Sequence, residues 1–269
     1  MPIELIVVPY VLGREGVGMG AGPLALERDA VAALRPERVV RVGLSSPFTN
    51  EIGACFDLNR QVAGAVAEAR RRQALPVVMT GNCHTQQAVV AGTGVERLGL
   101  VWLDCHADFN TPETTRSGFF DGSALAMTVG DCWSSLCASV PGFSPLSAER
   151  VMLVGLRDVE PAERSRLDAS PIAEVSPGDL RGLAERTSLH IDLDVLDPAY
   201  GRANQYAEPP GLDPGELLDV VRTVAAGSEL AALTLSAFDP AFDVTGSVHE
   251  TAVSALRVIA AVAGRESGG

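Results

Sequence analysis

Short apolar runs alternate with helical patterns along the chain, and this alternation constrains the fold more than any other feature. Val, Ile and Leu dominate seven runs, which cover residues 4–10, 38–44, 76–81, 98–105, 150–156, 189–196 and 230–238. Continuous apolar strands of this kind are typical of a parallel sheet that is covered on both faces. The sequence therefore predicts an α/β fold in which a mostly parallel central sheet lies between two layers of helices.

The segments between these runs carry helix start signals. Ser176 and Asp213 each precede a proline, and Glu216 adds the spacing of a capping box after Asp213. A last helix is expected over residues 247–264. No linker rich in Pro, Gly or Ser divides the chain, so we expect residues 1–269 to form a single three-layer α/β/α domain.

Charge and cysteine content narrow the class of protein. The formal net charge is −13 and the excess acid is spread along the chain, so no nucleic-acid partner is expected. No apolar run reaches membrane-spanning length, so no membrane partner is expected either. Five cysteines, an odd number in a chain this large, favour reduced thiols and a cytoplasmic location. The chain contains no lysine, which excludes a Schiff-base mechanism.

A carboxylate and histidine pattern follows the fourth apolar run. Asp104, His106 and Asp108 are spaced two residues apart. If the extended geometry of the strand persists, their side chains point to one side of the chain and Cys105 points to the other. A turn or a helix cap is the alternative interpretation of such a segment taken alone.

A second pair of carboxylates, Asp192 and Asp194, has the same spacing in another apolar run. Two buried carboxylates repel each other unless a cation lies between them. Several carboxylates and one imidazole suit a divalent ion such as manganese better than a tetrahedral structural zinc. The two segments together predict a binuclear metal site at the carboxyl ends of the strands.

Three segments resemble the ureohydrolases, the family that includes arginase and agmatinase. LDCHADFNTPETTRSG resembles the D-A-H-x-D segment of that family, HIDLDVLDP resembles its S-x-D-x-D-x-x-D-P segment, and LTLSAFDPAFD resembles its E-V-N-P segment. The resemblance implies an arginase-like three-layer fold and the hydrolysis of guanidino compounds by a hydroxide that bridges two manganese ions. It also implies that Asp104 and Asp192 serve both metals and that His106 and Asp194 complete one site. Asp108 and a residue of TGNCHT would complete the other.

The metal ligand within TGNCHT has two candidates. The family reads G-G-D-H-S here, with the histidine as ligand. Matching the final histidine selects His84, whereas matching the strand from Pro76 without a gap selects Cys83. Adjacent residues of an extended backbone point to opposite sides, so we expect only one of them to bind metal, and we favour Cys83. A thiolate ligand would leave zinc, iron or cobalt open as alternatives to manganese.

Three side chains suggest an α-amino-acid substrate. By the resemblance, Asn110 and Ser117 stand where arginase contacts the α-carboxylate of its substrate, and Glu160 stands where an acid approaches the α-amino group. Each has an alternative interpretation as a turn or cap residue.

Two positions depart from the family pattern. Ala237 occupies the position of the glutamate that holds the guanidinium, and Asp121 occupies that of the proton-shuttling histidine. Burying a charged arginine without that glutamate would cost several kcal/mol. We therefore expect a less basic substrate, with Asp121 and His84 as the candidate catalytic residues.

The predicted reaction is the hydrolysis of Nω-hydroxy-L-arginine to L-ornithine and hydroxyurea, a step known from cycloserine-type antibiotic biosynthesis. The alternatives are an arginase or another guanidino- or ureido-acid hydrolase, a non-catalytic member that keeps its metal as a clamp, and a deacetylase-type amidohydrolase with one metal. Because familiar arginases assemble through a C-terminal extension and this chain stops soon after its last helix, we expect a monomer or a different assembly.

Overall fold

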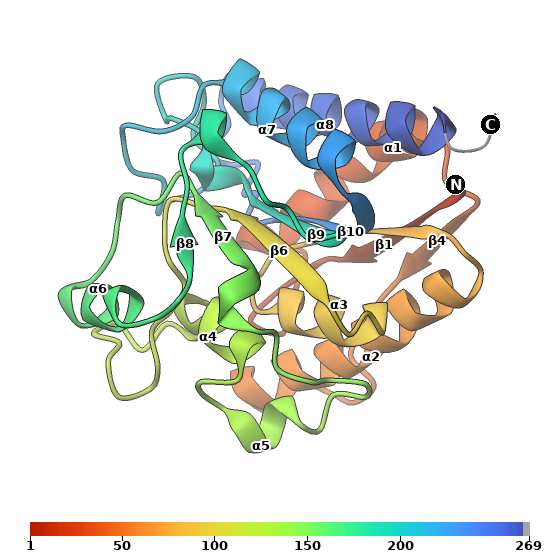
Figure 1. Cartoon of the computed structure of the whole chain (residues 1–269). Helices are drawn as coiled ribbons and strands as arrows, with labels where there is room; N and C mark the ends of the chain where they lie inside the picture. The colour runs from red at the N-terminus through yellow and green to blue at the C-terminus, as the bar shows by residue number, and fades with distance from the viewer. Residues whose placement is uncertain (266–269) are drawn as a thin grey trace.

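The apolar runs form one eight-stranded sheet in the computed structural model, which describes residues 1–265 (Figure 1). All pairs of neighbouring strands in this sheet are parallel. The strand order is β4 (Arg38–Arg41), β1 (Ile3–Val8), β5 (Leu75–Thr80), β10 (Glu229–Ser236), β9 (Arg186–Asp192), β6 (Leu98–Leu103), β7 (Val151–Val154) and β8 (Ala173–Glu174). The predicted parallel α/β fold is confirmed.

Helices cover both faces of the sheet, as Figure 1 shows. One layer contains α1 (Gly22–Leu34), α7 (Pro214–Gly227) and α8 (Ser247–Arg265). The other contains α2 (Glu51–Arg71), α3 (Thr85–Thr93) and α4 (Ala124–Val129). The short helices α5 (Ser134–Cys137) and α6 (Pro161–Asp168) lie at the periphery. None of the helices that the structure describes is long and apolar enough to cross a membrane.

Alternation along β1 shows why a largely apolar strand is needed at this place. Ile6 and Val8 pack into the core cluster on the α2 side, whereas Leu5 and Val7 pack into the cluster on the α1 side. Each buried aliphatic side chain contributes about 1.5–3 kcal/mol. A polar residue on either face would therefore lose stabilisation from one of the two layers.

Three short strands carry no sequence signal of their own. The strand β8 consists of two exposed residues at the sheet edge. The hairpin strands β2 (Tyr10–Val11) and β3 (Arg14–Glu15) also have only two residues each. Such segments show no periodicity, and their pairing depends on the strands and loops beside them.

The two predicted helix starts have different outcomes. The capping box of α7 forms, since Asp213 Oδ1 accepts from the Glu216 amide at 2.8 Å and Glu216 Oε2 accepts from the Asp213 amide at 2.9 Å. The helix expected after Ser176 is wrong, because only a single 3₁₀ turn at Pro177–Asp179 follows and the Ser176 side chain makes no capping bond. The last helix begins at Ser247, as predicted.

Candidate metal centre

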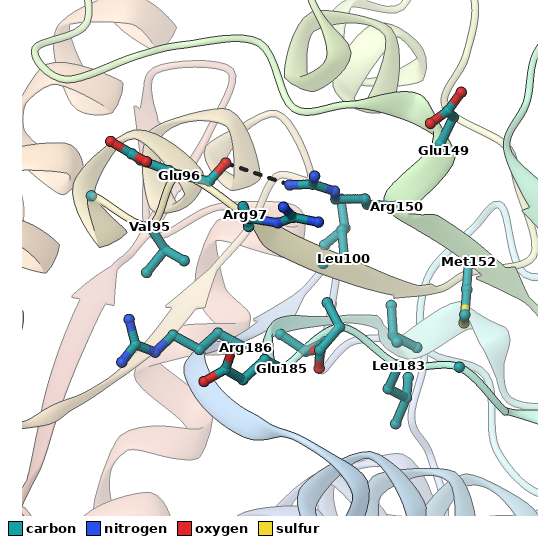
Figure 2. A pocket seen from close by; sticks show the side chains of 16 residues that line it. Val95, Glu96, Arg97, Leu100, Glu149, Arg150, Met152, Leu183, Glu185 and Arg186 are labelled. Carbon is teal, nitrogen blue, oxygen red and sulfur yellow. Dashed lines mark hydrogen bonds between the residues drawn. The ribbon is translucent and has the colours of Figure 1, made fainter.

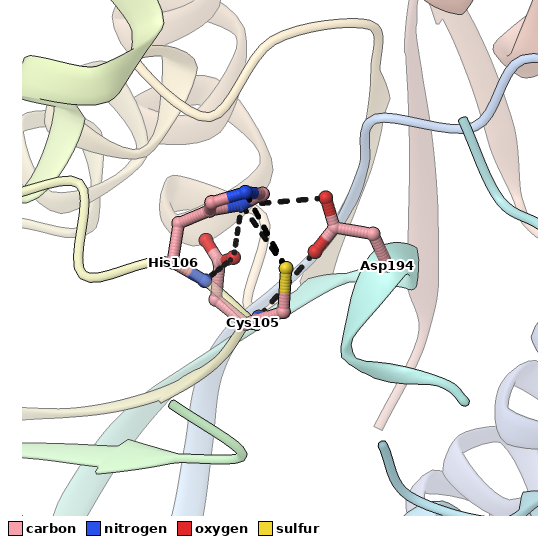
Figure 3. Close-up of side chains that lie close together, drawn as sticks. Cys105, His106 and Asp194 are labelled. Carbon is pink, nitrogen blue, oxygen red and sulfur yellow. Dashed lines mark hydrogen bonds and ion pairs between the residues drawn. The ribbon is translucent and has the colours of Figure 1, made fainter. Parts of the chain in front are cut away.

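The loops that follow β6 and β9 bring four donor side chains together. The two strands pair in parallel with Leu103 beside Ile191, so both end at the same edge of the sheet. The ligand atoms of Asp104, Cys105, His106 and Asp194 all lie within 4.8 Å of one another. His106 Nδ1 lies 3.3 Å from Asp104 Oδ1 and 3.4 Å from Asp194 Oδ2 (Figure 3).

Local turns orient the first aspartate after each of these strands, Asp104 after β6 and Asp192 at the end of β9. Asp104 Oδ1 accepts a hydrogen bond from the His106 amide at 2.7 Å, and Asp192 Oδ1 accepts one from the Asp194 amide at 2.8 Å. Aspartate commonly closes such turns with its own backbone two residues further on. The D-x-H and D-x-D spacings therefore fix the carboxylate orientation at the point where each strand ends.

Cys105 does not point away from His106, so the prediction from strand alternation is wrong here. Its Sγ lies 3.3 Å from His106 Nδ1 and 3.4 Å from Nε2, as Figure 3 shows. The reason is that β6 ends at Leu103, two residues earlier than the apolar run suggests. Asp108 has a positive φ of 46°, so an extended geometry does not persist to it either.

The segment TGNCHT separates its two candidate ligands. Cys83 Sγ donates to Asp192 Oδ2 at 2.9 Å and lies beside the carboxylate group. The His84 ring packs against Phe120 with ring centroids 5.3 Å apart, and its Nδ1 lies 3.2 Å from Asn59 Oδ1. This geometry favours Cys83 over His84 as the donor toward the centre.

Electrostatics indicate that the carboxylates are crowded. Burial and the charge of Asp194 raise the pKa of Asp104 to about 6. Burial and neighbouring carboxylates also hold the pKa values of Asp108 and Asp192 well above the usual range. Burial lowers the pKa of His106, but the carboxylates of Asp194 and Asp104 outweigh it and raise this pKa to about 10.

The residues present fit a pair of divalent cations. Several carboxylates buried side by side would repel one another, and cations between them remove the repulsion. Burial and the charge of Asp192 hold the pKa of the Cys83 thiol well above its usual range. A bound cation would invert this balance, because a coordinated thiol loses its proton. Oxygen donors together with one imidazole and one sulfur suit a borderline divalent ion.

A pocket of about 580 Å³ opens above these donors. The predicted substrate residues Asn110, Ser117 and Glu160 all line it, as do Cys83, His106, Asp108, Asp121, Asp192, Asp194 and Ala237. Glu160 Oε2 accepts from the Arg116 amide at 3.2 Å, which ties Glu160 to the loop that carries Ser117. The structure thus brings the predicted substrate residues and most of the predicted metal ligands to one pocket.

Asp121 makes contacts that differ from those expected of a proton shuttle. Its Oδ2 accepts from Asn82 Nδ2 at 2.7 Å and from the Cys83 amide at 2.9 Å. Its Oδ1 accepts from the His84 amide at 2.7 Å. Asp121 therefore holds the backbone of the turn that presents Cys83.

Four residues of the site were not identified from the sequence. Asn204 Nδ2 donates to Asp194 Oδ2 at 3.2 Å and to the Ala237 carbonyl at 2.8 Å, and Glu163 Oε1 accepts from the Phe109 amide at 2.7 Å. Ser236 on β10 and His190 on β9 lie beside Cys83. The histidine inside the apolar run at 189–196 was a signal for His190, and Ser236 lies in the segment LTLSAFDPAFD, whereas no motif marks Asn204 or Glu163.

A second hollow, of about 830 Å³, lies at the amino ends of β6, β7 and β9, opposite the candidate centre (Figure 2). Acidic and basic side chains line it in similar number, namely Glu96, Arg97, Glu149, Arg150, Glu185 and Arg186. It contains none of the predicted site residues. Because ligands of open parallel sheets bind beyond the carboxyl ends of the strands, we assign the chemistry to the smaller pocket.

Comparison with known proteins agrees with the motifs. A sequence model of the arginase family matches residues 3–264. The chain belongs to the arginase family. An arginase from Bacillus caldovelox is 30% identical to this arginase-family chain over 233 residues, which cover 74% of this chain and 77% of that protein. The N(omega)-hydroxy-L-arginine amidinohydrolase of Streptomyces lavendulae is 31% identical over 189 residues, which cover 65% of this chain and 67% of that protein.

Solved structures of the arginase family share the fold. The native structure of the Bacillus caldovelox arginase matches with a TM-score of 0.82 and 23% identity over 97% of both chains. The arginase of Bacillus subtilis matches with a TM-score of 0.85 and 21% identity, covering 97% of this chain and 98% of that one. The protein is thus a hydrolase of a metal-dependent family that acts on small molecules, which favours a ureohydrolase over the deacetylase-type alternative.

Proposed function

We propose that this arginase-family chain hydrolyses Nω-hydroxy-L-arginine to L-ornithine and hydroxyurea with the help of two manganese ions. The choice of substrate rests on one observation. Ala237 lines the pocket at the position where the resemblance expects the guanidinium-binding glutamate. A relative at 31% identity bears the name of this activity, which supports the proposal.

Glu51 is an unfavourable replacement for that glutamate. Glu51 lines the pocket, but its carboxylate pairs with Arg14 at 3.1 Å. Ala237 is 3% exposed, and the side chain nearest to its carbonyl is the neutral amide of Asn204. A buried guanidinium without an acidic partner would cost several kcal/mol. An N-hydroxyguanidine is less basic and can bind in its neutral form, so this cost is smaller for it.

The metal-holding residues in this proposal are Cys83, Asp104, His106, Asp108, Asp192 and Asp194. Divalent cations held there would lower the pKa of a water molecule and polarise the substrate. The chain's own residues supply binding and orientation. Asn110 and Ser117 would contact the α-carboxylate of the substrate, and Glu160 would attract its α-amino group.

Other residues keep this arrangement in place. Asn204 fixes the Asp194 carboxylate and Asp121 fixes the turn of Cys83, through the hydrogen bonds given above. The rings of Phe119 and Tyr206, with centroids 5.3 Å apart, contribute apolar surface to the pocket lining. A catalytic role for Asp121 or His84 in protonating the leaving group stays a prediction.

The decisive assay compares L-arginine and Nω-hydroxy-L-arginine as substrates of manganese-loaded protein. We expect kcat/KM for arginine to be lower by at least about a hundredfold, since each 1.4 kcal/mol corresponds to a factor of ten. Comparable values would refute the argument from Ala237 and would favour L-arginine hydrolysis. That second candidate is supported by the relatives named arginase.

Metal content tests the centre itself. We expect about two manganese ions per chain, whereas one would favour a mononuclear centre and none would contradict the proposal. Cys83→Ala should lower metal retention and His84→Ala should leave it unchanged. Cys137→Ala serves as the matched control, because it removes another fully buried thiol. Loss of metal from His84→Ala alone would reverse the assignment.

A further inference from the structure

A fully buried histidine lies beneath the candidate centre. His190 is on β9, two residues before Asp192, so both side chains project from the same face of the strand. Its ring stacks on Trp102 of β6 with centroids 3.8 Å apart and planes 24° apart. Trp102 Nε1 in turn donates to Asp104 Oδ2 at 2.9 Å. The imidazole therefore packs on the side chain that bonds to Asp104, and it projects from the same strand face as Asp192.

The two ring nitrogens of His190 have different surroundings. Nε2 lies 3.3 Å from Ser236 Oγ, which itself lies 3.2 Å from Cys83 Sγ. Nδ1 is buried and has no hydrogen-bond partner among the residues that the structure describes. An unpartnered polar atom in a protein interior is unfavourable and calls for an explanation. Packing on Trp102 explains the position of the ring but leaves this nitrogen without a function.

The donor atoms around His190 suggest a function for the ring. One nitrogen of His190, the Cys83 sulfur and a carboxylate oxygen of Asp104 lie within 4.8 Å of one another. Sulfur, imidazole and carboxylate are the donors that borderline divalent ions such as zinc or cobalt accept together. The group is separate from the cluster around His106, although Asp104 belongs to both.

We propose that His190 is an additional metal ligand, which completes the coordination of the ion held by Cys83. The inference rests on the proposed binuclear centre and extends its ligand set. In the family pattern S-x-D-x-D-x-x-D-P, serine stands at the position of His190, and histidine stands at that of Cys83. His190 on β9 would thus supply an imidazole in place of the histidine that the family pattern has at the position of Cys83, with Ser236 orienting both the ring and the thiolate.

Through-bond NMR on the full-length protein tests this ligand directly. The chain has four histidines, at positions 84, 106, 190 and 249, so isotope-labelled histidine gives few signals. Loading with an NMR-active cadmium isotope should split the nitrogen resonances of two histidines, which single substitutions assign to His106 and His190. His249 is the internal control, since it pairs with Asp29 on α1. A split His106 signal with an unsplit His190 signal would overturn the proposal and leave the centre intact.

Metal affinity provides the second readout. His190→Phe keeps a ring on Trp102 but removes both nitrogens, and we expect it to weaken binding of one ion by at least about tenfold. His249→Phe is the control, because His249 pairs with Asp29 and belongs to neither donor group, and it should bind both ions as the wild type does. Unchanged affinity in a folded His190→Phe variant would contradict the role of His190. Absence of cadmium splitting from every histidine would instead contradict the centre on which the inference rests.

Discussion

Replacing Asp121 with alanine distinguishes a structural from a proton-transfer role for this residue. The carboxylate accepts hydrogen bonds from two backbone amides, of Cys83 and His84, and from the Asn82 side chain. Asp121 is only 4% exposed, so water cannot readily replace it. Each buried donor left without a partner costs about 1–3 kcal/mol, and the two amides together give a destabilisation of about 2–6 kcal/mol.

Urea denaturation of the metal-free protein measures this effect without interference from metal binding. We expect the free energy of unfolding of Asp121→Ala to fall by that amount, and its metal retention to fall as well because the turn carrying Cys83 is released. Asp131→Ala is the control, since Asp131 makes a partly exposed ion pair with Arg166 at 2.9 Å. Such a pair contributes about 1 kcal/mol or less.

The opposite result would refute the reasoning. If Asp121→Ala unfolds at the wild-type urea concentration and retains its metal while kcat falls, the carboxylate acts in the reaction itself. Asp121→Asn sharpens the comparison, because its amide keeps one acceptor oxygen and cannot shuttle a proton as a carboxylate does. A structural role predicts an intermediate loss of stability for this variant.

For the metal-free protein, stability should fall as the pH rises between about 4 and about 6, because burial beside Asp194 raises the folded-state pKa of Asp104 to about 6. In this window the folded state binds more protons than the unfolded state, so the unfolding free energy decreases with pH. Thermal denaturation after chelation measures this slope, and an Asp104→Asn variant with the same slope would contradict it. Asp213→Ala should cost about 1 kcal/mol in urea denaturation, because it breaks the capping box with Glu216; no change would argue against the cap. Ala237→Glu should raise kcat/KM for arginine relative to hydroxyarginine in a competition assay, and an unchanged ratio would show that the lost carboxylate does not set specificity.

The fold was largely predictable because its signal is repeated. Each strand with both faces buried must be largely apolar, and β1 and β5 depart from this only at Glu4 and Thr80. The strand ends were less predictable, because the composition of an apolar run does not mark the residue at which the ladder hydrogen bonds end. The run at 98–105 ends as a strand at Leu103, and this difference of two residues explains the wrong orientation predicted for Cys105.

The residues of the candidate site were predictable to the extent that local spacing controls them. In D-x-H and D-x-D the first aspartate accepts a hydrogen bond from the backbone amide two residues later. The orientation of the Asp104 and Asp192 carboxylates therefore follows from local sequence. Asn204 has no such motif. Its amide donates to Asp194, 10 residues earlier in the chain, and to the Ala237 carbonyl, 33 residues later, and only folding brings these groups together.

By itself, the sequence determined a parallel α/β sheet and a set of carboxylate, imidazole and sulfur donors at the ends of its strands. Periodicity and short-range spacing depend only on residues close together in the chain, so both can be read directly from the sequence. The tertiary structure alone decided that Cys83 rather than His84 faces Asp192, that Asp121 holds their turn, and that His190 lies beneath Cys83. These relations depend on contacts between distant strands, whose distances no local pattern records.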